Sequence, residues 1–363
     1  MKEEPHVAKR VLVFPAGMPR SLTFLERALA EGQKVVGASS LGHDPARVRY
    51  PQWAYLPYVS STEFDKALKQ VIADHDIDGI FTPNPVVWDH LHRTLLQSCP
   101  GVSLVNSSPV DVEMAPYLTA LDFGKSVLAQ HLELAAIGDA KPTISRLEIA
   151  SLFRHADSIP GMCDHEKIRA LCEIFRYSPM GDIVEIGSWW GKSAFVLLRL
   201  AQCYKIGKLL CVDPWSNQHL IQNDEKGLVD RIPVSADEAL TVFQLNLLPY
   251  ANDAVNYLRM PSVEASLEYR RQKVIMTTAF GNTSYSGSIA ILHIDGNHSY
   301  ANAQADVSSW SDLVRPGGWI IIDDYLWPYG DGPQRAGDEF LSNCARKIIC
   351  AFVMGSALFI QMA

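Results

Sequence analysis

The sequence lacks both runs of basic residues and long apolar segments. Its net charge is −8 at pH 7, so its surface would on average repel a polyanion, and we expect no nucleic-acid partner. Prolines at positions 5, 15 and 19 interrupt the first thirty residues, which leaves neither a signal-peptide core nor the ~20 apolar residues of a membrane span. We therefore expect a cytoplasmic protein without a membrane partner.

The cysteines form no recognisable metal or redox motif. There are seven of them, none at C-x-x-C spacing, and the odd number argues against a disulfide framework. Internal repeats and low-complexity tracts are also absent. With 363 residues, 48% of them hydrophobic and 20% charged, the chain is large enough for two packed domains.

Strands alternate with helices in the N-terminal part. The pattern predicts strands at residues 10–17, 34–40 and 78–85, with helices at 21–31 and 63–75 between them. This order is typical of a parallel, Rossmann-like sheet with right-handed crossovers. Through VLVFPAG, RYPQWAYLP and FTPNP, residues 8–100 resemble the α/β domain that precedes ATP-grasp modules. No ATP-grasp catalytic half follows, so we carry over no nucleotide binding.

A second α/β run begins after an irregular stretch punctuated by Gly138, Pro142 and Pro160. We predict an auxiliary α/β domain at residues 1–145 and a second α/β domain at 146–363. The second domain opens with an amphipathic helix at residues 164–177. Its apolar side chains recur at helical spacing: Ile168, Leu171, Cys172, Ile174 and Phe175.

The segment EIGSWWGKS at residues 185–193 ends like the phosphate-binding loop of an ATPase. That loop requires a glycine at position 186, where this chain has Ile186. It would also have to wrap around phosphates while carrying Trp189 and Trp190. A dehydrogenase fingerprint is the other alternative, but the spacing to its third glycine is missing.

A different nucleotide turn fits more of these residues. The strand IVEIG places Glu185 two positions before Gly187, and Gly191 begins the next helix, so the backbone can approach a nucleoside closely. The following strand ends at Asp213, 22 residues after Gly191 (213 − 191), where a carboxylate can accept hydrogen bonds from both ribose hydroxyls. This pairing resembles class I S-adenosylmethionine-dependent methyltransferases. The resemblance implies these cofactor-binding residues: Glu185, Gly187, Ser188, Gly191, Ser193, Asp213, Trp215 and Ser262.

Two strongly apolar strands downstream also end in acids. IAILHID ends at Asp295, and WIIIDD ends at Asp323 and Asp324. In a parallel sheet these ends meet at one edge, where ligands of this architecture bind. Three carboxylates gathered there would repel one another without a cation between them, and oxygen ligands suit Mg²⁺ or another divalent ion.

The motifs IDGNHSY and PGGWIIIDDY narrow the resemblance over residues 160–363. They are similar to the metal-dependent sugar O-methyltransferases of macrolide and aminocoumarin pathways, of the macrocin and mycinamicin type. The resemblance implies that Asp295, Asp323 and Asp324 hold Mg²⁺, with Asp295 also counted as catalytic, and that His298 is the general base. Relatives with an aspartate base place it where this chain has Asn297, which favours His298.

The remaining signals concern the surroundings of this site. Residues 216–249 are placed to act as a lid, and the apolar segments at the C-terminus predict a closing antiparallel hairpin. His293, inside an apolar strand, is interpreted as a packing residue.

Together the patterns and the resemblance imply an S-adenosylmethionine- and Mg²⁺-dependent O-methyltransferase acting on a sugar or glycoside, and we expect a homo-oligomer. The alternatives are a non-catalytic cofactor-binding module for assembly or sensing, and a metal-dependent enzyme of the related cephalosporin-hydroxylase-like group. For the latter we can assign no iron-binding triad of two histidines and a carboxylate.

Overall fold

The computed structural model describes residues 10–136, 138–218 and 234–363. The chain forms two compact units, Met1–Leu118 and Thr119–Ala363. The division lies earlier than the predicted boundary after residue 145. The reason is helix α4 (Pro109–Ala129), whose Phe123 and Val127 are buried in the core of the second unit.

The first unit is built on a five-stranded parallel sheet in the order β3-β2-β1-β4-β5. This is a Rossmann-like order, as the sequence predicted. Its strands are β1 (Arg10–Val13), β2 (Lys34–Ser39), β3 (Gln52–Tyr55), β4 (Gly79–Phe81) and β5 (Ser103–Leu104), and its helices are α1 (Pro19–Ala30), α2 (Phe64–His75) and α3 (Pro85–Ser98).

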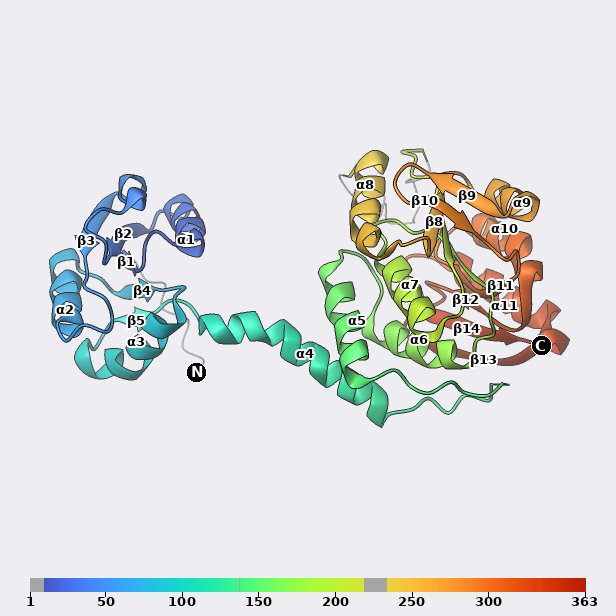
Figure 1. Ribbon diagram of the computed structural model, residues 1–363, viewed down its shortest axis with the longest axis horizontal. Coiled ribbons are helices and arrows are strands. Elements are labelled where there is room, and N and C mark those ends of the chain that lie inside the picture. Colours follow the sequence, from blue (N-terminus) through green and yellow to red (C-terminus); the bar gives the residue numbers. More distant parts are fainter. Residues whose placement is uncertain (1–9, 137, 219–233) are drawn as a thin grey trace. The chain divides into compact units, whose positions relative to one another are not determined.

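The second unit, drawn mostly in green, orange and red in Figure 1, is built on a seven-stranded sheet. The order of its strands is β13-β14-β12-β11-β6-β7-β8. β14 pairs antiparallel with both β12 and β13, whereas the pairs from β12 through β8 are parallel. This is the class I methyltransferase arrangement, and the antiparallel pair β13–β14 confirms the predicted closing hairpin. The strands are β6 (Asp182–Ile186), β7 (Leu209–Val212), β8 (Val255–Leu258), β11 (Ile289–Ile294), β12 (Val314–Ile322), β13 (Ile348–Met354) and β14 (Ala357–Met362).

Helices pack against both faces of this sheet. Because successive side chains of a buried strand point to opposite faces, Ile183 joins one apolar core and Val184 the other. The first core is completed by α5 (Arg146–Ser158), α6 (His165–Tyr177), α7 (Lys192–Tyr204) and α8 (Ala236–Leu247), and the second by α9 (Ser262–Arg271), α10 (Tyr300–Trp310) and α11 (Gly332–Asn343). A small antiparallel pair, β9 (Val274–Thr277) and β10 (Gly281–Ser284), follows α9.

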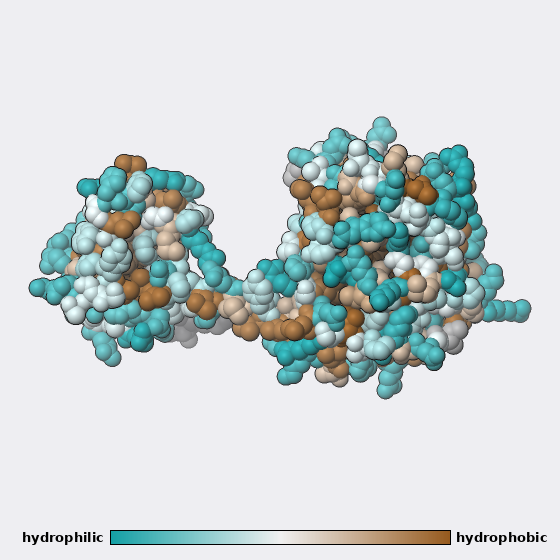
Figure 2. All heavy atoms as spheres, in the orientation of Figure 1, coloured by the Kyte–Doolittle hydropathy of each residue, from teal (hydrophilic) through white to brown (hydrophobic). Residues whose placement is uncertain are grey.

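The visible surface of each unit is largely polar, whereas apolar side chains gather along α4 (Figure 2). The large apolar residues that α4 exposes are Val110, Val112, Met114, Tyr117 and Leu118. Within the described part of the chain, no helix combines the length and the apolar character needed to cross a membrane.

Candidate active site

The ends of four neighbouring parallel strands bring the predicted site residues to one edge of the second sheet. Each strand makes one more backbone hydrogen bond, of 2.8–3.2 Å, just beyond its last residue. Carboxylates and glycine therefore emerge side by side, as the topology of a parallel sheet requires. The donors of these four bonds are the amides of Gly187, Asp213, Asp295 and Asp323.

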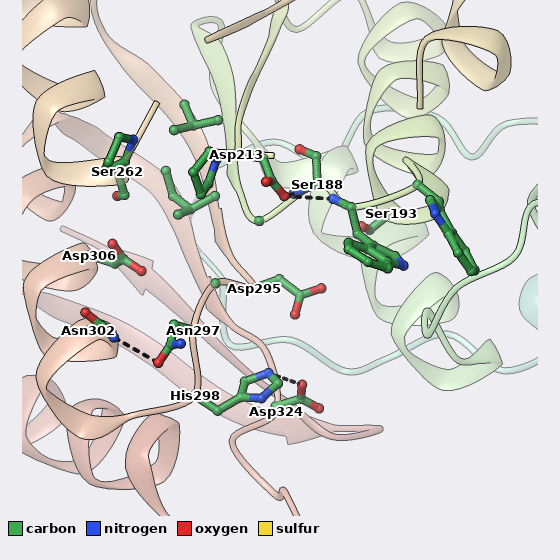
Figure 3. Close-up of a pocket in the computed structure, with 18 of the residues that line it drawn as sticks. Ser188, Ser193, Asp213, Ser262, Asp295, Asn297, His298, Asn302, Asp306 and Asp324 are labelled. Atoms are coloured by element: carbon green, nitrogen blue, oxygen red, sulfur yellow. Dashed lines mark hydrogen bonds and ion pairs between the residues drawn. The ribbon is translucent and has the colours of Figure 1, made fainter. Parts of the chain in front are cut away.

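A cavity of about 470 Å³ opens at this edge, a size suited to a nucleoside-containing ligand (Figure 3). Most of the predicted residues line it, namely Gly187, Ser188, Gly191, Ser193, Asp213, Ser262, Asp295, His298 and Asp324. Three do not: Glu185, Trp215 and Asp323.

Asp213 is held by the turn that follows β6. Its carboxylate accepts hydrogen bonds from the backbone amides of Ser188 (3.1 Å), Trp189 (3.0 Å) and Trp215 (2.8 Å). The turn can present its amides in this way because Gly187 and Trp189 adopt left-handed backbone angles, with φ of +80° and +45°. Burial raises the pKa of Asp213, and the three amide hydrogen bonds offset only part of that effect. A carboxylate has about four acceptor positions, so one is left for a ligand.

Two residues predicted to contact the cofactor lie away from the cavity wall. Trp215 is fully buried and packs against Phe243 and Tyr257 in the apolar core, so the expectation that it lies against the nucleoside is not supported. Glu185 is also fully buried, and its carboxylate accepts a hydrogen bond of 2.6 Å from the Ser188 hydroxyl. Glu185 therefore stabilises the turn through its hydrogen bond with Ser188.

A cluster of possible cation ligands lies at the cavity wall. One ligand atom each from Asp295, His298 and Asp324 lies within 4.8 Å of the other two. His298 Nε2 is 2.9 Å from Asp324 Oδ2. Burial and the neighbouring charges of Asp323 and Asp324 raise the pKa of Asp295 well above its ordinary value, although Lys167 opposes this. A bound cation would relieve that repulsion, and the oxygen donors fit a divalent ion with an adjacent imidazole.

Asp323, the third predicted ligand, is paired with a buried lysine and does not line the cavity. Lys167 Nζ on α6 donates a hydrogen bond to Asp323 Oδ2, and both side chains are almost fully buried. Burial alone would raise the pKa of Asp323, but Lys167 and His293 hold it well below its usual range. Asp323 is thus an ionised carboxylate whose charge is matched within the protein.

His293 extends this ion pair into a buried network. Its Nδ1 lies 3.2 Å from Glu185 Oε1 and its Nε2 lies 3.4 Å from Asp323 Oδ2. Burial alone would lower the pKa of His293, but its hydrogen bonds to Asp323 and Glu185 raise it to about 9. The sequence interpretation of His293 as a packing residue missed this charged role.

Lys167 escaped the sequence analysis, although a signal for it was present, and Asp306 was interpreted as a residue that either steadies the active-site loop or lies in solvent. Lys167 precedes Leu171 and Ile174 by four and seven positions, so it lies on the apolar face of α6. Asp306 likewise falls between Ala303 and Trp310 on the buried face of α10, and it lines the cavity. A charged residue on the buried face of an amphipathic helix is the sequence pattern that both residues share.

The loop after β11 is fixed by Asn297. Its side-chain oxygen accepts hydrogen bonds from the Ser299 amide (3.0 Å) and from Asn302 Nδ2 (2.9 Å), which places His298 at the cavity. Of the predicted lid, residues 219–233 lie outside the described residues, and α8 forms most of the remainder.

Comparisons with known proteins find similarity to methyltransferases. The family model of a methyltransferase domain matches residues 184–325, less than half of the chain. Among solved structures, the chain is similar to the O-methyltransferase NovP, with 17% identity and a TM-score of 0.41, covering 70% of this chain and 100% of that one.

Two further solved structures are similar to this chain, with comparable identities and TM-scores. CalS11, a TDP-rhamnose 3'-O-methyltransferase of calicheamicin biosynthesis, has 13% identity and a TM-score of 0.38, with coverage of 71% of this chain and 96% of that one. MycE of the mycinamycin pathway, in complex with Mg and SAH, has 17% identity and a TM-score of 0.37, with coverage of 62% and 56%. The fold is identified by the strand order described above rather than by these distant likenesses.

Proposed function

We propose that this protein transfers a methyl group from S-adenosylmethionine to a hydroxyl of a sugar or glycosylated small molecule, with the help of a divalent cation such as Mg²⁺. The match of residues 184–325 to the family model of a methyltransferase domain supports the proposal. The observation that carries the proposal is the clustering of Asp295, His298 and Asp324 on the wall of the cavity that Gly187 and Asp213 also line.

The cofactor would bind along the row of strand ends. The turn at Gly187 and Gly191 allows the backbone to approach it, and the remaining acceptor position of Asp213 suits a ribose hydroxyl. Ser188 and Ser193 offer hydroxyl groups on the same wall. Asp295, His298 and Asp324 line the same cavity as these residues, so an acceptor held there would share it with the cofactor.

Asp295 and Asp324 would hold the cation, and the motif resemblance adds Asp323, whose carboxylate is paired with Lys167 in this structure. When bound, the cation would supply Lewis acidity that makes the acceptor hydroxyl a better nucleophile and orients a vicinal diol. S-adenosylmethionine, when bound, would supply the methyl group for an in-line displacement by the acceptor oxygen, and His298 would accept the proton that the hydroxyl loses. Asp324, 2.9 Å from His298 Nε2, orients the imidazole for this step.

The proposal is tested by incubating the protein with isotopically labelled S-adenosylmethionine, Mg²⁺ and a panel of sugar nucleotides and glycosides. We expect one acceptor class to gain the mass of a methyl group and EDTA to prevent it. Asp295→Ala should abolish turnover and leave cofactor affinity nearly unchanged. His298→Ala should lower the rate roughly 10²–10⁴-fold, the usual contribution of a general base.

A matched variant, Asp338→Ala, removes an aspartate on α11 that does not line the cavity and should keep wild-type turnover. A wild-type rate for His298→Ala would remove that residue from the mechanism. Cofactor binding without transfer to any acceptor would instead favour a non-catalytic binding module.

A further inference from the structure

A second group of possible cation ligands lies beside the cluster at the cavity wall. Its members are His293, Asp295 and Asp323, called the inner group below, and one ligand atom from each lies within 4.8 Å of the other two. Asp295 belongs to both groups, and in Figure 3 it lies above the pair formed by His298 and Asp324. His293 and Asp323 are buried and do not line the cavity. The inner group therefore lies deeper in the protein than the first cluster.

The inner group has the donors of a divalent-cation site. Carboxylates and an imidazole suit such ions, and two neighbouring carboxylates repel each other unless a positive charge lies between them. A metal-binding histidine usually donates its other ring N–H to a carboxylate, and His293 Nδ1 lies 3.2 Å from Glu185 Oε1. Its Nε2 has only a long contact of 3.4 Å with Asp323 Oδ2 and no well-formed hydrogen bond. This buried nitrogen thus faces the inner group with its bonding capacity largely unused.

Lys167 already supplies a positive charge to the inner group. Its Nζ donates a hydrogen bond to Asp323 Oδ2 and another, of 3.4 Å, to the carbonyl oxygen of Met162. The charge of Asp295 also attracts the ammonium group. Carboxylate and backbone carbonyl oxygens are the groups that would surround a metal ion at this place. The ammonium group therefore takes up oxygen atoms that a second cation would need.

The place of Lys167 in the fold is unfavourable for a lysine by itself. It lies in the first turn of α6, where the helix dipole disfavours a positive charge, and only 1% of its side chain is exposed. Burying an ammonium group is costly unless an opposite charge accompanies it. Helix formation and apolar packing therefore do not explain this lysine, whereas the acids of the inner group do.

We propose that the Lys167 ammonium group occupies the cation position of the inner group and thereby limits this protein to one divalent ion, at the cavity wall. This inference rests on the proposed function, because it takes the first ion to be held by Asp295 and Asp324. A lysine is tethered to the chain, so the charge of Asp323 is compensated whether or not metal is available. Without the lysine, the inner group should accept a metal ion, with Asp295 shared between two ions as in two-metal sites.

The test counts the Mn²⁺ ions bound per chain by electron paramagnetic resonance of the free ion, with the full-length protein. We expect one ion for the wild type and two for Lys167→Ala, which removes the ammonium group and leaves space for a cation. Mn²⁺ should also raise the urea midpoint of Lys167→Ala more than that of the wild type, because it restores the lost countercharge. Lys167→Ala combined with Asp323→Asn should return to one ion, since the inner group then lacks a charged ligand.

The control is Lys208→Ala, which removes an exposed lysine paired with Asp253 and should bind one ion. Two ions in the wild type would overturn the inference, and so would a single ion in Lys167→Ala beside one in the wild type. If Lys167→Ala is unfolded in EDTA, recovery of the fold in Mn²⁺ supports the inference and failure to recover overturns it.

The same count separates this inference from the proposed function. No ion in the wild type but one in Lys167→Ala would support the inference and remove the cation from the proposed function. If neither protein binds an ion, both fail.

Discussion

Replacing Lys167 with methionine should destabilise the second unit strongly, because Lys167 is the buried countercharge of Asp323. The exposed fractions of the two side chains are 1% and 3%. Removing one partner of a buried ion pair costs about 3–5 kcal/mol, since the remaining charge stays out of water. Asp323 would keep His293 at 3.4 Å and the Asp324 amide at 3.0 Å, so we expect the lower end of that range, about 3 kcal/mol at pH 7.

The loss should depend on pH in a defined direction. Because Asp323 has a lowered folded-state pKa in the wild type, its ion pair stabilises the fold above the unfolded pKa of ~3.9, and this contribution is lost as the pH falls. In Lys167→Met the carboxyl group would be easier to protonate. The difference in unfolding free energy between variant and wild type should therefore be largest near pH 7 and shrink toward pH 4.

Urea unfolding followed by tryptophan fluorescence, with EDTA present, measures this difference. The signal reports mainly on the second unit, which holds six of the eight tryptophans, Trp189, Trp190, Trp215, Trp310, Trp319 and Trp327. The control is Lys208→Met, which breaks an exposed ion pair with Asp253 and should change the free energy of unfolding by less than about 1 kcal/mol.

A double variant separates the ion pair from other packing of the lysine. Lys167→Met combined with Asp323→Asn should be more stable than Lys167→Met alone, because no uncompensated charge is left. If the two losses simply add, or if Lys167→Met is no less stable than Lys208→Met, Lys167 is not the countercharge of Asp323.

Three further predictions concern the cavity. Gly187→Ala should lower the free energy of unfolding by more than the ~1–3 kcal/mol that a left-handed backbone costs, because its Cβ would lie 1.9 Å from the Asp295 carbonyl oxygen. Gly317 has nearly the same φ but open space around it, so in urea unfolding Gly317→Ala should lose the backbone contribution only. Asp306→Asn should stabilise the ligand-free protein by up to about 3 kcal/mol at pH 7. Because the folded-state pKa of Asp306 is raised to about 6, the wild type loses stability as the pH rises from ~4 through 6. The free energies of unfolding of the wild type and Asp306→Asn should therefore become equal near pH ~4 in pH-dependent denaturation. A difference that stays constant with pH would contradict this. Asp213→Ala should weaken cofactor binding in calorimetry, and an unchanged affinity would disprove the ribose contact.

The sequence contains enough information for the sheet and its row of acids. Runs such as IAILHI and WIII are typical of strands buried on both faces, and parallel strands bring their carboxyl ends together at one edge of the sheet. Asp213, Asp295 and Asp324 therefore reach the cavity wall as predicted. The helix at residues 164–177 was predictable for a similar reason, since its apolar period is local.

The direction in which each side chain points beyond a strand end cannot be predicted from the neighbouring sequence. Asp323 and Asp324 are adjacent, yet Asp323 turns toward Lys167, 156 residues away in sequence, while Asp324 reaches the cavity from a left-handed backbone with φ of +50°. Trp215 turns into the core in a comparable way, with φ of +35°. Such backbone angles are unusual for these residue types, and a sequence pattern does not predict them.

The acids below and at the cavity wall differ in how their charge is compensated. Below the wall, Glu185 and Asp323 are matched by His293 and Lys167, two negative charges against two positive ones. At the wall, Asp295 and Asp324 have His298 beside them. A cation is therefore most needed by the acids at the wall, and we expect Asp323 to position its neighbours rather than to coordinate the ion.

Manganese binding, followed by electron paramagnetic resonance, decides this assignment without reference to turnover. Asp295→Asn should lose most of its Mn²⁺ affinity, because the cation would lose a charged ligand on the cavity wall. Asp323→Asn should keep Mn²⁺ binding within a few-fold of the wild type, since Lys167 already balances that carboxylate. An equal loss of affinity in both variants would mean that the cation displaces Lys167 and that Asp323 is a ligand, as the motif resemblance implies.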